Sequence, residues 1–280
     1  MAGNLTKRIL FAVVAIPAAA GVIWLGGWWL AAAIAALAVL GAREVYDLAA
    51  RHGIVPLRLI GYAGAAFLPL AAYAARSWPL IGTAAAYLAI IWLLKVLVLA
   101  MARGPGQRPL AAVSVTVFGA LYTSAPLTFL VAIRHGAAAP LAGFALVLLP
   151  LALTWICDTA AFMAGSQFGG PKMAPVLSPR KTWSGAVGGV AGALLAAALL
   201  GPVLQRAGGT LSLMQLLGLG LVVGVVGQVG DVAESLLKRE AGVKDSSDLI
   251  PGHGGVLDRL DSLYFVIPAS AALYQLYGAI

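Results

Sequence analysis

The chain has so few charged side chains that long stretches of it are unable to face water. Lys, Arg, Asp and Glu make up 10% of its 280 residues, whereas a soluble globular protein carries about 25%. The run from Ile9 to Ala42 contains no charge at all. This scarcity argues against a soluble enzyme, a disordered tail and a nucleic-acid-binding domain. With a mean hydropathy of +0.96, the sequence predicts a protein that crosses a membrane several times.

Apolar segments long enough to cross a bilayer recur along the whole chain. A spanning helix needs about 20 apolar residues, and nine segments are of that order: 9–25, 28–48, 57–76, 79–101, 110–132, 138–165, 183–203, 212–237 and 262–279. We therefore expect an all-α, polytopic integral membrane protein with about nine transmembrane helices. The first segment follows Lys7 and Arg8 as a secretory signal does, but the uncharged run is too long for one. We expect an uncleaved helical hairpin there.

The positions of Lys and Arg between these segments predict the orientation. With the N-terminus in the cytoplasm, fourteen of the 18 basic residues fall on the cytoplasmic side and three on the opposite side, while Lys95 lies inside a segment. Cytoplasmic loops of membrane proteins are enriched in Lys and Arg. The sequence therefore predicts a cytoplasmic N-terminus. It also places the charged segments 166–182 and 238–261 at the cytoplasmic face of the cell (inner or plasma) membrane.

The acidic residues gather near the C-terminus. Seven of the ten lie within 231–261. Residues 1–157 carry ten basic and two acidic residues, a net charge of +8, whereas residues 158–280 carry eight of each. We expect residues 1–137 to form N-terminal transmembrane helices and residues 138–280 a catalytic transmembrane region, within one membrane domain overall. The basic residues are scattered singly between apolar runs, a pattern that the orientation of a membrane protein explains. We therefore expect no nucleic-acid partner.

The acids within 231–261 can share helical faces. If the eighth segment stays helical to Arg239, its polar residues spaced i, i+3, i+4 and i+7 lie on one face. These residues are Asp231, Glu234, Ser235 and Lys238. Asp258 and Asp261 are three residues apart and would share a face in the same way. The glycine-rich turn at 251–255 would fold this second pair back toward the first.

Carboxylates and cations in one segment favour a metal–phosphate site. Hard divalent ions such as Mg²⁺ prefer carboxylate and phosphate oxygens, and Lys and Arg neutralise the remaining phosphate charge. The cations of this segment are Lys238, Arg239, Lys244 and Arg259. The alternative is a solvated loop with ordinary surface charges, but the rest of the chain is almost devoid of acids.

A second polar group lies around the end of the sixth segment. Asp158 sits in an apolar stretch, where an ionisable group is costly and is a functional candidate by default. The alternative is a carboxylate that reaches water at the helix end. In the loop that follows, Ser178 precedes a proline and Thr182 is placed to cap the next helix. The loop cations are Lys172, Arg180 and Lys181. Together with backbone N–H groups at a helix start, these cations would form an anion site. The alternative is that they only mark a cytoplasmic loop, where Lys and Arg are enriched.

The seventh and eighth segments contain glycines at the four-residue spacing of close helix contacts. The pairs are Gly185/Gly189, Gly188/Gly192 and Gly220/Gly224. Small residues at this spacing let two membrane helices approach each other closely. The single Cys157 excludes an intramolecular disulfide and is expected to be a small buried residue.

The C-terminal motif is similar to that of a known family. Residues 235–261 read SLLKREAGVKDSSDLIPGHGGVLDRLD, with GDVAE directly before them. This run resembles the signature of bacterial phosphatidate cytidylyltransferase, also called CDP-diacylglycerol synthase. Asp158, with the FG, SP and KT elements that follow it, resembles the second block of that family. The family often has a tyrosine where this chain has Phe162, and a Glu or Gln where it has Ser184.

The resemblance implies an activity and a set of site residues. CTP and phosphatidate would react to give CDP-diacylglycerol and diphosphate for phospholipid biosynthesis, through in-line attack of the lipid phosphate on the α-phosphate of CTP, with Mg²⁺ as cofactor. Asp231 and Asp258 would be metal ligands, and Asp261 a third. The cations that neutralise phosphate would be Lys181, Lys238, Arg239, Lys244 and Arg259. Other expected substrate contacts are Asp158, Ser178, Thr182, Glu234, Ser235, Asp245, His253, Gly254 and Gly255. Besides the surrounding membrane lipids, the family implies a homodimer.

Three other functions remain open at the level of the sequence. The same chemistry would serve another lipid phosphate, such as an ether lipid or a prenyl-type phosphate. An ion-coupled transporter would place Lys95, Asp158 and Asp231 on an ion path, but the charges gather at one membrane face and not at the midplane, where transporter sites lie. A structural scaffold would leave the carboxylate cluster unexplained.

Overall fold

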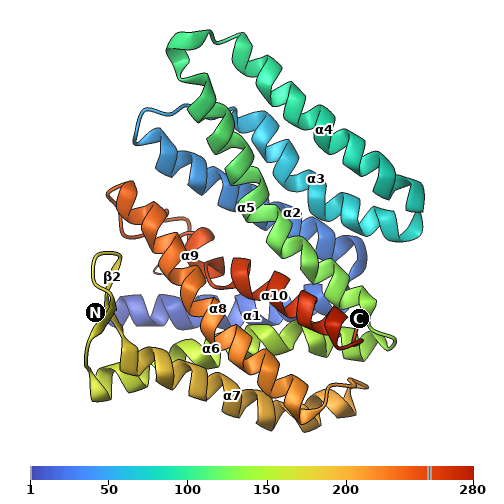
Figure 1. The fold of residues 1–280 in the computed structure, drawn as a ribbon, viewed down its shortest axis with the longest axis vertical. Coiled ribbons are helices and arrows are strands. Elements are labelled where there is room, and N and C mark those ends of the chain that lie inside the picture. Colours follow the sequence, from blue (N-terminus) through green and yellow to red (C-terminus); the bar gives the residue numbers. More distant parts are fainter. Residues whose placement is uncertain (1, 251, 253) are drawn as a thin grey trace. The chain divides into compact units, whose positions relative to one another are not determined.

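The computed structural model describes residues 2–250, 252 and 254–280, and for residues 2–11 and 79 it describes the backbone alone. Apolar segments in a bilayer fold as helices because no water is present to satisfy their N–H and C=O groups. The helices are α1 (Ala2–Leu25), α2 (Gly27–Ala50), α3 (Arg58–Ser77), α4 (Pro79–Met101), the 3₁₀ helix η1 (Pro105–Gln107), α5 (Pro109–Gly136), α6 (Pro140–Phe168), α7 (Trp183–Arg206), α8 (Leu213–Glu240), α9 (Leu257–Leu260) and α10 (Leu263–Leu276) (Figure 1). The predicted all-α, polytopic fold class is confirmed.

Each of the nine predicted segments coincides with a helix. Among the described residues, seven helices are long and apolar enough to cross a membrane, namely α2 to α8. Helix α10 has 14 residues and is therefore about 21 Å long, shorter than the predicted segment 262–279. It ends early because the N–H groups of Gly278 and Ala279 turn back onto carbonyls of the last helical turn. Gly278 adopts the positive φ of 66° that such a helix end requires.

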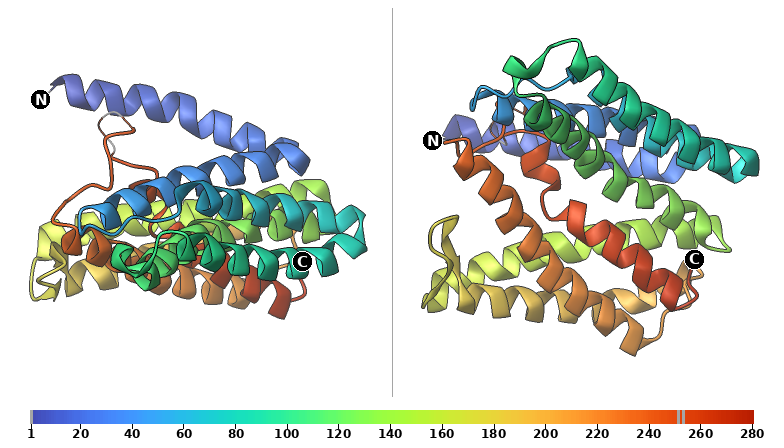
Figure 2. Two further views of the ribbon diagram at one scale, coloured as in Figure 1. Left: turned by 90° about the horizontal axis from the view of Figure 1, so that it is seen from above. Right: turned by 45° about the horizontal axis from the view of Figure 1, so that its top comes forward.

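The chain divides into two compact units. The first consists of Met1–Val131 and Glu240–Arg259, and the second of Ala132–Arg239 and Leu260–Ile280. Within the first unit, α2 packs against α1 and α3, and α3 packs against α4 (Figure 2). The segment between α8 and α9, which carries part of the C-terminal motif, belongs to the unit of the N-terminal helices.

In the second unit, glycines of α7 and α8 allow close helix contacts. A Cβ added to Gly188 of α7 would lie 2.3 Å from the Cβ of Ala164 of α6. A Cβ added to Gly220 of α8 would lie 2.9 Å from the carbonyl oxygen of Ala193 of α7. Figure 1 shows α7 running beside α6 in this unit. The close contacts predicted from the glycine spacing are therefore confirmed for both helices.

Gly188→Ala is expected to destabilise the α6–α7 pair. The added methyl group lies closer to Ala164 than two carbon atoms can approach, and relief requires a helix shift that costs about 1–3 kcal/mol. Gly21→Ala is the matched control, since nothing lies within 4 Å of its added Cβ and both changes bring the same gain in helix propensity. Thermal unfolding in detergent should show a lower midpoint for Gly188→Ala than for Gly21→Ala. Equal midpoints would contradict the close contact.

Helices α6 and α7 are joined by a β-hairpin, where the sequence predicted a loop. Strands β1 (Lys172–Ala174) and β2 (Ser178–Thr182) are antiparallel, and Lys172 lies opposite Thr182. Strands this short show no periodic pattern of apolar residues, so the hairpin was not detectable from the sequence. Thr182 caps α7 as predicted, because its Oγ1 accepts a hydrogen bond from the N–H of Gly185 at 3.2 Å.

Candidate active site

Asp231 on α8 forms an ion pair with Lys181 on β2. The Nζ of Lys181 lies 2.6 Å from Oδ2 of Asp231 and 3.5 Å from the carbonyl oxygen of Gln228. The two side chains of the pair are partly exposed, Lys181 by 23% and Asp231 by 32%. The hairpin therefore places a cation expected to bind phosphate directly on a carboxylate expected to bind metal.

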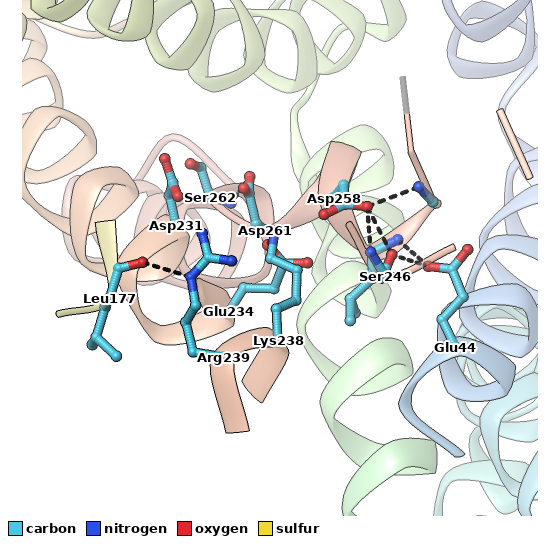
Figure 3. A network of polar contacts seen from close by, with 12 residues as sticks. Glu44, Leu177, Asp231, Glu234, Lys238, Arg239, Ser246, Asp258, Asp261 and Ser262 are labelled. Atoms are coloured by element: carbon cyan, nitrogen blue, oxygen red, sulfur yellow. Dashed lines mark hydrogen bonds and ion pairs between the residues drawn. The ribbon is translucent and has the colours of Figure 1, made fainter. Parts of the chain in front are cut away.

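Arg239 makes a second link between α8 and the hairpin. Its Nε donates a hydrogen bond to the carbonyl oxygen of Leu177 at 3.2 Å (Figure 3). Leu177 lies in the turn between β1 and β2. The hairpin is thus held on α8 at two places, through Lys181 and through its turn. The hairpin also carries two exposed cations, Lys172 and Arg180.

Glu234 and Lys238 form a buried ion pair one turn further along α8. Oε2 of Glu234 lies 2.6 Å from Nζ of Lys238, and the two side chains are 0% and 10% exposed. The spacing i, i+4 brings such side chains together on a helix, and α8 does extend past Arg239, as the predicted shared face requires. Removing a charge from water is costly unless a partner compensates it. The charge of each of these two buried residues is therefore stabilised by the opposite charge of the other.

Asp261 lies in the turn between α9 and α10, close to other carboxylates. Its Oδ1 accepts a hydrogen bond from the N–H of Ser262 at 2.6 Å. The pKa of Asp261 is raised to about 7, mainly by burial and then by the negative charges of Asp231 and, to a smaller extent, Asp158. The N–H of Ser262 and the ammonium of Lys238 act in the opposite direction. Asp231 and Asp158 therefore both lie within electrostatic range of Asp261 in the second unit, and Figure 3 shows Asp231, Asp261 and Ser262 in one group.

The prediction that Asp258 and Asp261 share one face of a helix is wrong. Helix α9 ends at Leu260, so Asp261 falls one residue beyond it. The carboxylate of Asp261 accepts a hydrogen bond from the adjacent N–H of Ser262. Such local contacts of aspartate compete with the hydrogen bonds of a helix.

Asp258 in the first unit organises the loop that precedes it. Its Oδ2 accepts hydrogen bonds from the N–H groups of Ser246 and Gly255, each at 2.8 Å. It also lies 2.9 Å from Oγ of Ser246, whose one hydroxyl proton it shares with Glu44. Gly254, with φ of 80°, comes so close that an added Cβ would lie 2.5 Å from the same oxygen. Two of the predicted site glycines therefore allow the chain to turn around the Asp258 carboxylate.

Glu44 on α2 contacts the C-terminal motif, which the sequence did not predict. Glu44 is 2% exposed, and its carboxylate accepts hydrogen bonds from Ser246, Ser247, Val256 and Leu257, all between α8 and the first residue of α9. One signal was available, since an acid next to an apolar span is a functional candidate by default. Glu44 is less conspicuous than Asp158 in the sequence, because it stands next to Arg43 and close to Asp47 near the end of an apolar segment.

The other predicted site residues are distributed over both units. In the first unit, Lys244, Asp245 and Arg259 are exposed on the motif segment. In the second, Asp158 is exposed, Ser178 is half-buried and Ser235 is buried on α8. His253 lies outside the described residues.

The acids of the second unit are suited to sharing a metal ion with a substrate. Within the described part of the chain, no three His, Cys, Asp or Glu side chains converge closely enough to hold a metal by themselves. Mg²⁺ does not require such a cage, because it is usually bound through one or two carboxylates, waters and substrate phosphates. Asp231 and Asp261 are carboxylates whose mutual repulsion an added cation would relieve. This donor set therefore fits a magnesium ion that arrives with a phosphate ligand.

Comparison with known proteins identifies related sequences over nearly the whole chain. The profile of a family described as "Cytidylyltransferase family" matches residues 6–277. A phosphatidate cytidylyltransferase of Synechocystis sp. is 32% identical over an aligned length of 293 residues, which covers 94% of each of the two chains. Phosphatidate cytidylyltransferase 4, chloroplastic, of Arabidopsis thaliana is 32% identical over 94% of this chain and 72% of its own length. A phosphatidate cytidylyltransferase of Brucella suis biovar 1 is 46% identical over 138 residues, so the match spans about half of that relative, 48% of its length.

Proposed function

Because the chain belongs to the cytidylyltransferase family and is a nucleotidyltransferase, we propose that it is a phosphatidate cytidylyltransferase. It transfers the cytidylyl group of CTP to phosphatidate and so makes CDP-diacylglycerol and diphosphate for phospholipid synthesis. The relatives with this printed name, which match up to 94% of the chain, supply the substrates of the proposal.

The observation that carries the proposal is the charged cluster of the second unit. Asp231 and Asp261 interact electrostatically, Lys181 is paired with Asp231, and Lys238 is paired with Glu234 one turn away. Carboxylates next to cations are what a nucleoside triphosphate with its metal ion requires. In a chain with only ten acidic residues, such a grouping supports phosphate chemistry.

We propose that Mg²⁺ is bound by Asp231 and Asp261 of the second unit. The family resemblance also names Asp258, which belongs to the first unit, as a metal ligand. When bound, the ion supplies positive charge to the phosphate oxygens of CTP. Oδ2 of Asp258 already accepts hydrogen bonds from two backbone N–H groups, which hold its carboxylate in one orientation. Lys181 is expected to leave Asp231 for a phosphate oxygen when CTP binds, since both partners are partly exposed to water.

The chain's own residues then bind and orient the substrates. A phosphate oxygen of phosphatidate forms a bond to the α-phosphorus of CTP, the bond from that phosphorus to the bridging oxygen breaks, and diphosphate leaves. No general base is needed, because the second pKa of a phosphate monoester is about 6 and its oxygen is largely ionised at neutral pH. The expected role of Lys181, Lys238 and Arg239, together with Lys244 and Arg259, is to neutralise the triphosphate and the departing diphosphate.

The protein is a multi-pass membrane protein, and we propose that its site faces the cytoplasm from the cell membrane. CTP is dissolved in the cytosol while phosphatidate is held in the bilayer, so the reacting atoms must meet at the interface. Lys and Arg are in excess in the loops predicted to lie on the same side of the membrane as the N-terminus, which supports this orientation. A homodimer is part of the proposal through the family resemblance alone.

The lipid substrate is tested by supplying alternatives. Purified protein in vesicles would receive CTP and Mg²⁺ with phosphatidate, an ether-linked analogue or a prenyl phosphate. The proposal expects a CDP-lipid from phosphatidate. A product formed only from the prenyl phosphate would refute the lipid assignment, and ion movement without CTP consumption would support a transporter instead.

Single-cysteine labelling is expected to show the orientation. Asp248 and Ser77 are exposed in the first unit, and the predicted topology puts them on opposite sides of the membrane. An impermeant thiol reagent added to inside-out vesicles should label Asp248→Cys and spare Ser77→Cys. The wild-type chain is the control, since its single Cys157 is buried. The reverse labelling pattern would overturn the cytoplasmic placement of the motif.

A further inference from the structure

The carboxylate of Glu44 bonds two separated parts of the motif segment. Oε1 accepts hydrogen bonds from Oγ of Ser247 at 2.7 Å and from the N–H of Val256 at 2.9 Å. Oε2 accepts from Oγ of Ser246 at 2.8 Å and from the N–H of Leu257 at 2.8 Å. All of these residues belong to the first unit, and Figure 3 shows Glu44 and Ser246 facing each other. A single side chain of α2 therefore fixes both ends of the intervening segment, 248–255.

These contacts satisfy the carboxylate fully in a buried position. A carboxylate away from water is costly unless it is hydrogen-bonded, and hydrogen bonds to an ionised acceptor are roughly twice as strong as neutral ones. Each oxygen of Glu44 accepts one hydroxyl and one backbone N–H. The contacts join residues 202 to 213 positions apart in the sequence. Local propensity therefore cannot produce this arrangement.

Gly255 allows the carboxylate to approach the loop. A Cβ on Gly255 would lie 2.4 Å from each oxygen of Glu44 and 2.2 Å from Oγ of Ser246. The N–H of Gly255 donates to Oδ2 of Asp258 at 2.8 Å. The loop is thus held between two carboxylates, Glu44 and Asp258, and the hydroxyl of Ser246 contacts both.

We propose that Glu44 is a positioning residue for the reaction. It holds residues 246–247 and 256–257 in place, and this arrangement presents Lys244, Asp245 and Asp258 to CTP. The inference rests on the proposed function, because the motif segment is taken as part of the nucleotide site. Glu44 acts through the loop and not by touching substrate. Its loss should therefore weaken CTP binding more than it lowers the reaction rate of bound CTP.

The test replaces Glu44 by glutamine and compares it with Asp47→Asn. Glutamine keeps the size of the side chain but puts an NH₂ group, which donates, in front of two donors. Asp47 is on the same helix, is 44% exposed and pairs with Arg58 at 2.6 Å, so its asparagine variant removes the same charge without touching the loop. Two quantities are measured: hydrogen exchange of the amides of Val256 and Leu257, and KM and kcat for CTP.

Glu44→Gln should speed exchange of both amides by about tenfold or more, as expected when charge-assisted hydrogen bonds are lost. It should raise KM for CTP by a similar factor with a smaller change in kcat. Glu44→Asp, which keeps the charge, should fall between the wild type and Glu44→Gln, and Asp47→Asn should match the wild type. A fall in kcat at unchanged KM would contradict the positioning role.

The exchange measurement separates this inference from the proposed function. If the wild type makes no CDP-lipid, the proposed function fails, while the amide exchange still shows whether Glu44 holds the loop. Wild-type exchange in Glu44→Gln overturns the inference whatever the activity. Should Glu44→Gln not fold, Ser247→Ala removes one of the four donors and should raise exchange at Val256 and KM for CTP severalfold. Unchanged values in that variant would also overturn the inference.

Discussion

Asp231→Asn is expected to lower CTP turnover at least about a hundredfold, the scale seen when one group that stabilises the transition state is removed. The asparagine has the shape of the aspartate but lacks the charge that binds Mg²⁺ and attracts Lys181. Stability should change little, because partly exposed ion pairs contribute about 0–1 kcal/mol. The measurement is initial rate at saturating CTP, phosphatidate and Mg²⁺, together with the thermal unfolding midpoint.

The control for this variant is Asp47→Asn. Asp47 is an exposed aspartate on α2 that pairs with Arg58 and has no assigned role in catalysis. Its asparagine variant should keep wild-type turnover. Asp231→Asn with near-normal rates and an intact fold would refute the metal role of Asp231.

Lys238→Met is expected to produce the largest loss of stability. It leaves Glu234, which is 0% exposed, without the cation 2.6 Å away, and breaking a buried pair in this way costs about 3–5 kcal/mol. Methionine preserves the length and the helix propensity of lysine, so the lost charge is the main change. Unfolding of the purified protein by added denaturing detergent measures the effect.

The double variant Glu234→Leu/Lys238→Met separates charge from packing. Replacing both members of a buried pair by apolar residues of similar size is often neutral or stabilising, so the double variant should regain most of the stability lost in Lys238→Met. A double variant no more stable than the single one would show that the pair is not compensating a buried charge.

The membrane fold was predictable because one physical constraint dominates it. Apolar segments must satisfy their own backbone in lipid, so hydropathy alone located every described helix of spanning length. Helix ends were less predictable: α10 ends at Leu276 through a glycine turn that hydropathy does not detect. The β-hairpin between α6 and α7 was also missed, since its strands have three and five residues and carry no periodic pattern.

Contacts within one helix of the candidate site followed from its sequence, and contacts between distant segments did not. The i, i+4 spacing on α8 predicts that Glu234 and Lys238 share a face, and the structure pairs them. The spacing of Asp258 and Asp261 predicted a shared face only under the assumption of a continuous helix, which ends at Leu260. No periodicity relates Glu44 to Val256, because the two meet only through the tertiary fold.

The fate of the CTP phosphates tests the central claim most directly. Purified protein in phosphatidate vesicles with Mg²⁺ would receive CTP labelled with ³²P at either the α or the γ position. The proposed reaction predicts that α-label appears in the lipid as CDP-diacylglycerol, that γ-label appears in diphosphate, and that the two products form in equal amounts only when phosphatidate is present. Folded protein that leaves CTP intact, or that transfers the γ-label to lipid, would contradict cytidylyl transfer.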